Sequence, residues 1–342
     1  YGVARLVETL RPIDRVSIVV YAGASGLVLP PTPGDEEDRI VEALDRLGAG
    51  GGTAGAAGIR LAYQTAREHF DPEGINRVIL ATDGDFNVGV ASRSELVELI
   101  ERERESGVFL TVLGVGRGNL NDAAMEQIAD HGNGNYAYLD RRSEARKVLV
   151  EQANETLITI AKDVKIQVEF NPERVRAYRL IGYENRRLAD QDFNDDRKDA
   201  GEIGAGHQVT ALYEIVPADA SPGAIPGGSV DPLKYQKRLE STPAAASGEW
   251  LTVKLRYKAP DGEESRVTST SLAGRAGRFE TASQNARFSS AVALFGMLLR
   301  ESEFKGAGSY ALVDDLARGS VGSDEHGERR EFLELVSLAA AL

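Results

Sequence analysis

The sequence has no cysteine, and this absence excludes thiol catalysis, zinc–thiolate sites and disulfide bonds. Only four histidines are present, and two of them, His131 and His207, stand isolated with no catalytic triad visible around them. No apolar run approaches the roughly 18 residues that cross a bilayer, and no signal peptide is visible. The lack of cysteine leaves the compartment open, and we expect no transmembrane segment in this chain.

Acidic residues outnumber basic ones. The sequence has 53 Asp and Glu residues and 40 Lys and Arg residues, which gives a net charge of −13 at pH 7. A surface of this sign repels phosphates, so we expect no nucleic-acid partner and no docking on an anionic membrane. The charge is compatible with cation binding, although most of it belongs to solvated surface. No pattern in the sequence indicates a small-molecule substrate.

The chain has 342 residues, a length that suggests two or three domains. It begins with Tyr1 and not with Met. Residues 1–10 read as the end of an amphipathic helix, because the apolar side chains of Val3, Leu6, Val7 and Leu10 fall on one face. We therefore expect the chain to be a fragment that lacks its natural N-terminus.

Strands and helices alternate through residues 1–160, the pattern of a doubly wound α/β fold with a mostly parallel sheet. The strands are short apolar runs without polar alternation, which is typical of strands buried on both faces. Strands are predicted at 15–22, 24–30 (stopped by Pro30 and Pro31), 77–82, 108–115 and 135–139, and helices at 35–47, 53–70, 92–106, 120–129 and 143–161.

After residue 160 the pattern changes to alternation of apolar and polar residues, the signature of half-exposed antiparallel strands. We predict a β-sandwich-like domain over 161–280, with a long mobile loop at 217–247 that is rich in Pro, Gly, Ala and Ser. A helical C-terminal segment follows over 281–342. The predicted strands of the middle domain are 164–170, 175–183, 207–216, 250–257 and 264–272.

The apolar strand 77–82 ends in Asp83 followed by Gly84. Open α/β sheets bind ligands beyond the carboxyl ends of their strands. A carboxylate at that place suits a hard cation such as Mg²⁺, which prefers oxygen ligands. The alternative is that Asp83 caps the next helix or closes an Asp-Gly turn.

Residues 50–55 formally match G-x-G-x-x-G. The dinucleotide-binding motif requires a strand immediately before it, whereas here a predicted helix precedes it, so nucleotide binding is not expected. Thr53 follows the flexible glycines and precedes a helix. Its hydroxyl is either a second metal ligand beside Asp83 or the N-cap of that helix.

Three other interpretations involve acidic residues. Residues 83–94 do not fit a calcium loop of the EF-hand type, because Val88 and Ser94 stand where Gly and Glu are needed. Phosphoryl transfer with Asp83 as nucleophile and Asp85 as acid is chemically possible but lacks an obvious lysine partner. The acidic run at 190–199 could bind Ca²⁺ loosely, and a solvated loop is the default interpretation.

Residues 1–160 resemble a von Willebrand factor type A domain, the fold that carries the metal-ion-dependent adhesion site. Gly-Gly-Thr at 51–53 is similar to that family's second metal-binding element, and Ala-Thr-Asp-Gly at 81–84 to its third. The resemblance implies that Thr53 and Asp83 are metal ligands. The family's first element, Asp-x-Ser-x-Ser, has no match here and would lie upstream of Tyr1 with the central strand of the sheet. Segments 178–186, 192–196 and 199–207 resemble the C-terminal domain of the bacterial YfbK-like proteins.

The resemblance implies a non-enzymatic protein-binding module in which a bound Mg²⁺, or Mn²⁺ or Ca²⁺, accepts a carboxylate from a partner protein. Without the Ser pair, cation binding by this fragment would be weak or absent. The expected location is the bacterial cell envelope, periplasmic or membrane-anchored. A scaffold with a vestigial metal site is the alternative, and a Mg²⁺-dependent phosphohydrolase using Asp83 and Asp85 is a third hypothesis. Strands 15–22 and 77–82 are expected either to close the gap left by the missing strand or to leave exposed edges.

Overall fold

The protein is described from a computed structural model. The described residues are 1–21, 26–48, 55–83, 93–116, 120–183, 187–196, 198, 200–221 and 241–342. The chain forms two compact units. One comprises 1–166, 191–207 and 255–268, and the other comprises 167–190, 208–254 and 269–342. These units do not test the three-domain division predicted from the sequence, which stays a prediction.

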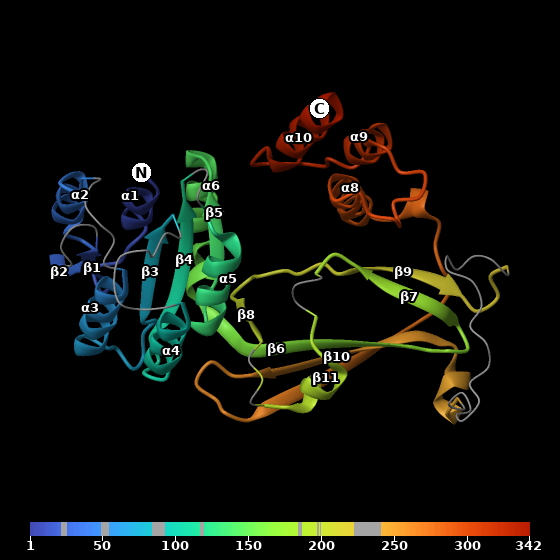
Figure 1. The fold of residues 1–342 in the computed structure, drawn as a ribbon, viewed down its shortest axis with the longest axis horizontal. Coiled ribbons are helices and arrows are strands. Elements are labelled where there is room, and N and C mark those ends of the chain that lie inside the picture. Colours follow the sequence, from blue (N-terminus) through green and yellow to red (C-terminus); the bar gives the residue numbers. More distant parts are fainter. Residues whose placement is uncertain are drawn as a thin grey trace. The chain divides into compact units, whose positions relative to one another are not determined.

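A parallel sheet of three strands organises the first unit, in the order β3 (Arg77–Thr82), β4 (Phe109–Val115), β5 (Tyr136–Leu139). Strand β3 pairs with β4 over its whole length, and β4 pairs with β5 from Val112 onward. The parallel sheet flanked by helices, with antiparallel strands and helices later in the chain, confirms the predicted fold class (Figure 1). The helices of this region are α1 (Gly2–Val7), α2 (Glu37–Asp45), α3 (Gly55–Glu68), α4 (Arg93–Arg104) and α5 (Asp122–His131).

The sheet is buried on both faces, as its unbroken apolar strands predicted. Val78 and Leu80 of β3 join one core with side chains of α3, α4 and α5, including Tyr63, Ile100 and Met125. The side chain between them, Ile79, packs into a second core on the opposite face, with residues of α1 and of segment 142–151. Successive residues of one strand thus serve two different cores.

Strands β1 (Arg15–Val20) and β2 (Gly26–Pro33) form an antiparallel hairpin. The prediction that Pro30 and Pro31 end the second strand is wrong, because β2 continues to Pro33. Among the described strands β2 pairs with β1 alone, so its other side is an edge. Proline is tolerated on an edge strand, where its missing N–H costs no ladder hydrogen bond.

The predicted helix 143–161 is also corrected. The segment forms α6 (Arg142–Arg146), a π-helical turn (Lys147–Glu151) and α7 (Ala153–Leu157), and the chain is extended from Thr159. The π turn widens the helix and buries Val148 and Leu149 against the sheet. The alternating strand therefore begins earlier than the sequence pattern indicated.

The β-rich region contains a four-stranded sheet with the order β11–β10–β6–β8 and an antiparallel pair, β7 with β9. Most of the predicted mobile loop 217–247 falls on 222–240, outside the described residues. On its flanks β9 runs to Pro217, and Pro243–Ser247 form a 3-10 turn. The strands are β6 (Thr159–Phe170), β7 (Val175–Ile181), β8 (Gly201–Gly204), β9 (Leu212–Pro217), β10 (Glu249–Lys258) and β11 (Ser265–Ala273).

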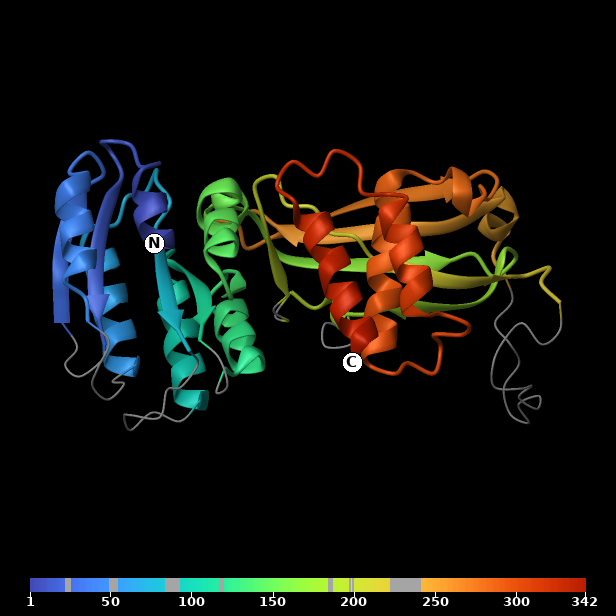
Figure 2. The ribbon, with the colours of Figure 1, turned by 90° about the horizontal axis from the view of Figure 1, so that it is seen from above.

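The chain ends in three helices, α8 (Gln284–Leu299), α9 (Tyr310–Arg318) and α10 (Glu328–Ala341), which lie side by side (Figure 2). Ser283 and Ser309 cap the first two by accepting hydrogen bonds from backbone N–H groups. Ala291, Val313 and Val336 form the centre of a core that the three helices share. No helix in the described part of the chain is both long and apolar enough to cross a membrane.

Strands β1 and β3 leave unpaired edges. Among the described strands, β1 hydrogen-bonds with β2 alone and β3 with β4 alone, so the two strands do not close on each other. Of the two outcomes expected for this gap, the structure shows exposed edges. Backbone groups on such an edge hydrogen-bond to water or to another chain.

Native-state hydrogen exchange should detect the open edge of β3. In a strand paired on one side, every second amide points away from the partner, and we expect these amides of β3 to exchange far faster than their neighbours. Strand β4 is the internal control, because residues 112–114 pair with both β3 and β5. Uniform protection along β3, measured by NMR on this chain, would contradict the prediction and show that another strand pairs there.

Candidate metal centre

Asp83 lies directly after the last residue of β3, at the edge of the sheet where the parallel strands β3, β4 and β5 all end. The preceding residue, Thr82, is buried, whereas Asp83 is half-buried. The strand therefore holds the backbone of Asp83 in a packed layer and leaves the carboxylate close to solvent. This is the position at which open α/β sheets bind ligands.

Gly116 follows β4 and lies beside Asp83. A Cβ atom at Gly116 would come 3.4 Å from the Cβ of Asp83, and Gly116 has φ +113°, a conformation that favours glycine. Tyr138 of β5 fixes this glycine by donating a hydrogen bond of 2.8 Å to its carbonyl oxygen. Gly116 therefore lies in van der Waals range of the Asp83 side chain, at the edge where β3 and β4 end.

Tyr21 approaches the same edge from the hairpin. Its hydroxyl donates a hydrogen bond of 2.6 Å to the carbonyl oxygen of Ala81, two residues before Asp83. Burial raises the pKa of Tyr21; a hydrogen bond with the Thr82 side chain acts against this, and the nearby charge of Asp83 adds to it. The phenol is therefore neutral at physiological pH and acts as a hydrogen-bond donor.

A second carboxylate near this edge is already engaged. Asp122, at the start of α5, accepts a short hydrogen bond from the hydroxyl of Tyr136 on β5. Burial, together with this carboxylate, raises the pKa of Tyr136. Asp122 therefore ties α5 to β5.

The other residues predicted for the site lie outside the described residues. These are Thr53 with the glycines at 50–52, and Asp85. Within the described ranges, no group of three or more His, Asp or Glu side chains is arranged to hold a metal ion. The assignment of Thr53 and Asp83 as ligands stays a prediction, for which the structure supplies the placement of Asp83.

The sequence interpretation missed Tyr21, Gly116 and Tyr138. Tyr21 and Gly116 each stand within one residue of the end of a strand that the sequence predicted. The rule that ligands bind beyond the carboxyl ends of strands holds for these strands as it does for strand 77–82. Both residues are therefore visible in the sequence as residues at strand ends, whereas Tyr138, inside a strand, is not.

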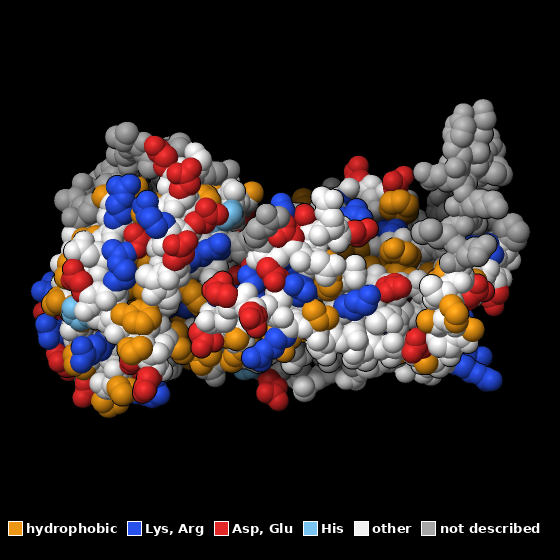
Figure 3. All heavy atoms as spheres, turned by 90° about the horizontal axis from the view of Figure 1, so that it is seen from below, with side chains coloured by type: hydrophobic (Ala, Val, Ile, Leu, Met, Phe, Trp, Pro, Cys, Tyr) orange, Lys and Arg blue, Asp and Glu red, His pale blue; other side chains and the backbone are white. Residues whose placement is uncertain are grey.

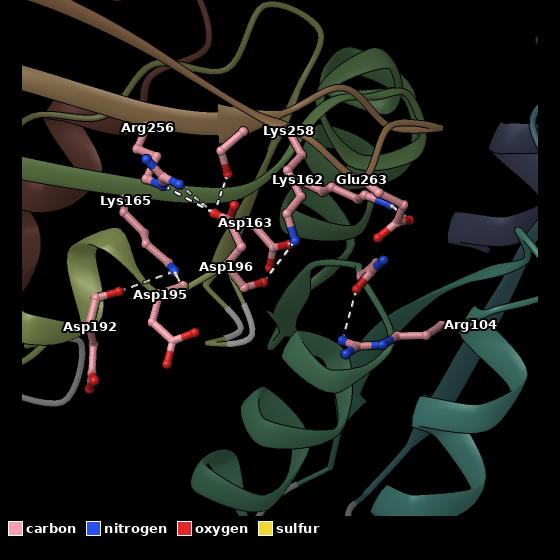
Figure 4. A network of polar contacts seen from close by, with 12 residues as sticks. Arg104, Lys162, Asp163, Lys165, Asp192, Asp195, Asp196, Arg256, Lys258 and Glu263 are labelled. Atoms are coloured by element: carbon pink, nitrogen blue, oxygen red, sulfur yellow. Dashed lines mark hydrogen bonds and ion pairs between the residues drawn. The ribbon is translucent and has the colours of Figure 1, made fainter.

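The acidic run at 190–199 is not a free loop where it is described. Asp190–Asn194 form a 3-10 turn that buries Phe193. Figure 4 shows cationic side chains from β6 and β10 directed at this segment. The Nζ of Lys165 donates to the carbonyl oxygens of Asp192 and Asp195, and the guanidinium of Arg256 bonds to the carboxylate of Asp196 at 2.7 Å. Two backbone carbonyls of this segment and the Asp196 carboxylate are thus bonded to cationic side chains of β6 and β10.

The two histidines noted in the sequence, His131 and His207, each lie near a glutamate carboxylate. His131 Nδ1 lies 2.7 Å from a carboxylate oxygen of Glu101, which joins α5 to α4. His207 Nδ1 lies 3.9 Å from Glu155. Neither residue lies beside a serine and an aspartate in a triad in the part of the chain that the structure describes.

Two family models match the chain. Residues 3–172 match the von Willebrand factor type A domain, and residues 155–342 match the family described as "Uncharacterized protein YfbK, C-terminal". The chain is 43% identical over 334 residues to the uncharacterized protein YfbK of Escherichia coli strain K12. That alignment covers 98% of this chain and 56% of the relative, so the chain spans about half of the relative's length.

Solved structures of the same fold are more distant. A von Willebrand factor type A protein from Catenulispora acidiphila is 17% identical, with a TM-score of 0.44 and coverage of 96% of this chain and 76% of that one. Proximal thread matrix protein 1 of the mussel byssus, described with zinc in its adhesion-site motif, is 20% identical, with a TM-score of 0.37 and coverage of 45% and 40%. The matches to the two family models show that the chain belongs to the YfbK family and consists of a von Willebrand factor type A domain followed by the YfbK C-terminal region.

Proposed function

We propose that the protein is a non-enzymatic module that binds a partner protein through a divalent cation. Thr53 and Asp83 would hold the cation, which is Mg²⁺, Mn²⁺ or Ca²⁺, and a carboxylate of the partner would bind to it. The observation that carries the proposal is the place of Asp83, a carboxylate directly after β3 at the carboxyl edge of the parallel sheet, beside Gly116. Membership of the family supports it, since von Willebrand factor type A domains mediate protein interactions.

The chemistry of the two side chains supports this type of site. A threonine hydroxyl is a neutral ligand, and one carboxylate neutralises only part of a divalent charge. A cation held in this way keeps affinity for one further anionic oxygen. An acidic side chain of another protein supplies such an oxygen. The carboxylate of Asp83 and the backbone of β3 position the cation, and no bond of the partner is made or broken.

Surface charge favours a protein partner over nucleic acid. On the face drawn in Figure 3, acidic and basic side chains are interspersed, and the basic ones among the described residues form no continuous patch. The net charge of −13 also disfavours a nucleic-acid partner, because it repels phosphates. A partner that offers one carboxylate to a bound cation avoids this general repulsion, because the contact is local and charge-compensated.

The first test is a calorimetric titration with Mg²⁺ and Mn²⁺ of the full-length natural protein that contains residues 1–342. We expect saturable binding in the unsubstituted protein and none after Asp83→Ala, because the substitution removes the charged ligand. Asp85→Asn is the comparison variant. It should leave cation binding intact, whereas a phosphohydrolase that uses Asp85 as acid would lose turnover of a phosphomonoester. Equal binding by the Asp83→Ala variant, or no binding by any form, would contradict the proposal and favour a scaffold role.

A further inference from the structure

Strand β11 lies at one edge of the four-stranded sheet. It hydrogen-bonds with β10 on one side, and among the described strands none pairs with its other side (Figure 1). Eight of its nine residues are exposed, so neither face of the strand is covered by the rest of the chain. The open side of β11 therefore presents a row of backbone N–H and C=O groups to solvent.

This edge lacks the features by which proteins usually prevent their edge strands from pairing. Such strands are typically short or carry lysine or proline. Strand β11 has nine residues, against roughly 5–6 in a typical strand, and contains neither lysine nor proline. Its one charged residue is Arg266, near its start, and residues 267–273 are all uncharged. A long, neutral edge of this kind can pair with another extended chain.

The strand is held in place at both ends. The hydroxyl of Ser265 donates a hydrogen bond to the carboxylate of Asp196, and the indole N–H of Trp250 donates one of 2.9 Å to the carbonyl oxygen of Gly274, directly after the strand. An edge that is already ordered loses little conformational freedom when a second strand is added to it, which lowers the cost of association.

The charges on the two sides of β11 are of opposite sign. The exposed acidic residues before it and the exposed basic residues after it are Asp261, Glu263 and Glu264, and Arg275 and Arg278. If two copies of the strand pair antiparallel, the acidic start of each lies beside the basic end of the other. Parallel pairing would instead bring like charges together. The flanking charges thus make β11 complementary to a second, antiparallel copy of itself.

We propose that two copies of the chain associate through β11, antiparallel and centred near Thr270, so that their sheets join across a two-fold axis. A two-fold interface uses the same surface on both copies, as the two oppositely charged ends of one strand require. In this arrangement Arg266 lies opposite the uncharged end of the other strand. A contact made by one strand is small, so we expect a dissociation constant on the order of 10 µM.

The experiment is sedimentation equilibrium of the full-length natural protein, at concentrations from about 1 to 200 µM that bracket this dissociation constant. Three variants test the interface: Thr270→Lys, Arg275→Glu and the charge exchange E264R/R275E. The control is Ser337→Lys, which adds the same charge at an exposed position of α10. All the substituted side chains are exposed, and circular dichroism verifies that each variant is folded.

The unsubstituted protein should dimerise, and Ser337→Lys should dimerise equally well. Thr270→Lys brings two ammonium groups together near the two-fold axis, and we expect dimerisation to weaken at least about 10-fold. Arg275→Glu places a carboxylate beside the acidic start of the other copy at both ends of the interface, which should weaken dimerisation about 3- to 10-fold. The exchange E264R/R275E restores opposite charges across the axis and should recover most of this loss.

A full-length protein that stays monomeric over the whole concentration range would overturn the proposal. So would a dimer that Thr270→Lys leaves unchanged, because its interface would then lie elsewhere. If Arg275→Glu weakens the dimer and E264R/R275E weakens it further, the antiparallel arrangement is wrong. Equal weakening by Thr270→Lys and Ser337→Lys would also contradict the proposal, since the effect would then come from added charge alone.

Discussion

Lys258→Met is expected to lower the free energy of unfolding by about 3–5 kcal/mol. Lys258 is only 6% exposed, and its Nζ lies 2.8 Å from a carboxylate oxygen of Asp163. The same nitrogen donates to the carbonyl oxygen of Asp196 at 2.9 Å. Methionine fills a similar volume but leaves the Asp163 carboxylate, whose side chain is only 16% exposed, without its cation, and this uncompensated charge is the main cost. Urea denaturation followed by circular dichroism measures the change.

Two further variants isolate the charge effect. K258M/D163N removes both charges, and it should recover part of the loss; asparagine tolerates the positive φ of 53° at position 163. Lys254→Met makes the same change on the same strand, at an ion pair with Glu169 that is largely exposed. Exposed pairs contribute about 1 kcal/mol or less. A loss of equal size at positions 254 and 258 would show that burial of the pair is not the cause.

Burial of these lysines also shows where sequence patterns fail. In β6 the alternation of residues 164–170 predicted apolar side chains inside and polar ones outside. Instead, Lys165 is 4% exposed and Ile166 is 52% exposed. The reason is tertiary: segment 190–196 folds over Lys165 and offers its backbone carbonyls to the ammonium group. The alternation of neighbouring residues in a strand cannot indicate a hydrogen-bond partner such as Asp192, which is 27 residues away from Lys165 in sequence.

The parallel sheet was predictable because its signal is local. Strands β3 and β4 are apolar runs buried on both faces, and such runs need no knowledge of their partners. Asp83 could be found for the same reason, since the residue after a buried strand is read directly from the sequence. Tyr21 and Gly116 also stand at the ends of predicted strands, but their contacts with Ala81 and with Asp83 can be identified only when the strand ends are placed together.

Leu110→Ala should cost about 2–5 kcal/mol, the range for a buried leucine whose site cannot collapse. Leu110 lies in β4, the strand that pairs with β3 and β5, and its side chain is fully buried in the main core with Ile100 and Ile128. Leu272→Ala is the matched control, because Leu272 is in strand β11 with 56% exposure. That control should lose less than about 1 kcal/mol, since little apolar area is withdrawn from water there.

The single tryptophan extends this test to the second unit. Trp250 belongs to that unit, with its ring 5.0 Å from the guanidinium of Arg174 and its indole N–H bonded to the carbonyl of Gly274. Strands β6 and β10 each contain residues of both units, so disrupting the core around Leu110 should release both together. We therefore expect Leu110→Ala to shift the transition seen by Trp250 fluorescence as far as the one seen by circular dichroism. A fluorescence transition that stays in place would mean that the two units unfold separately.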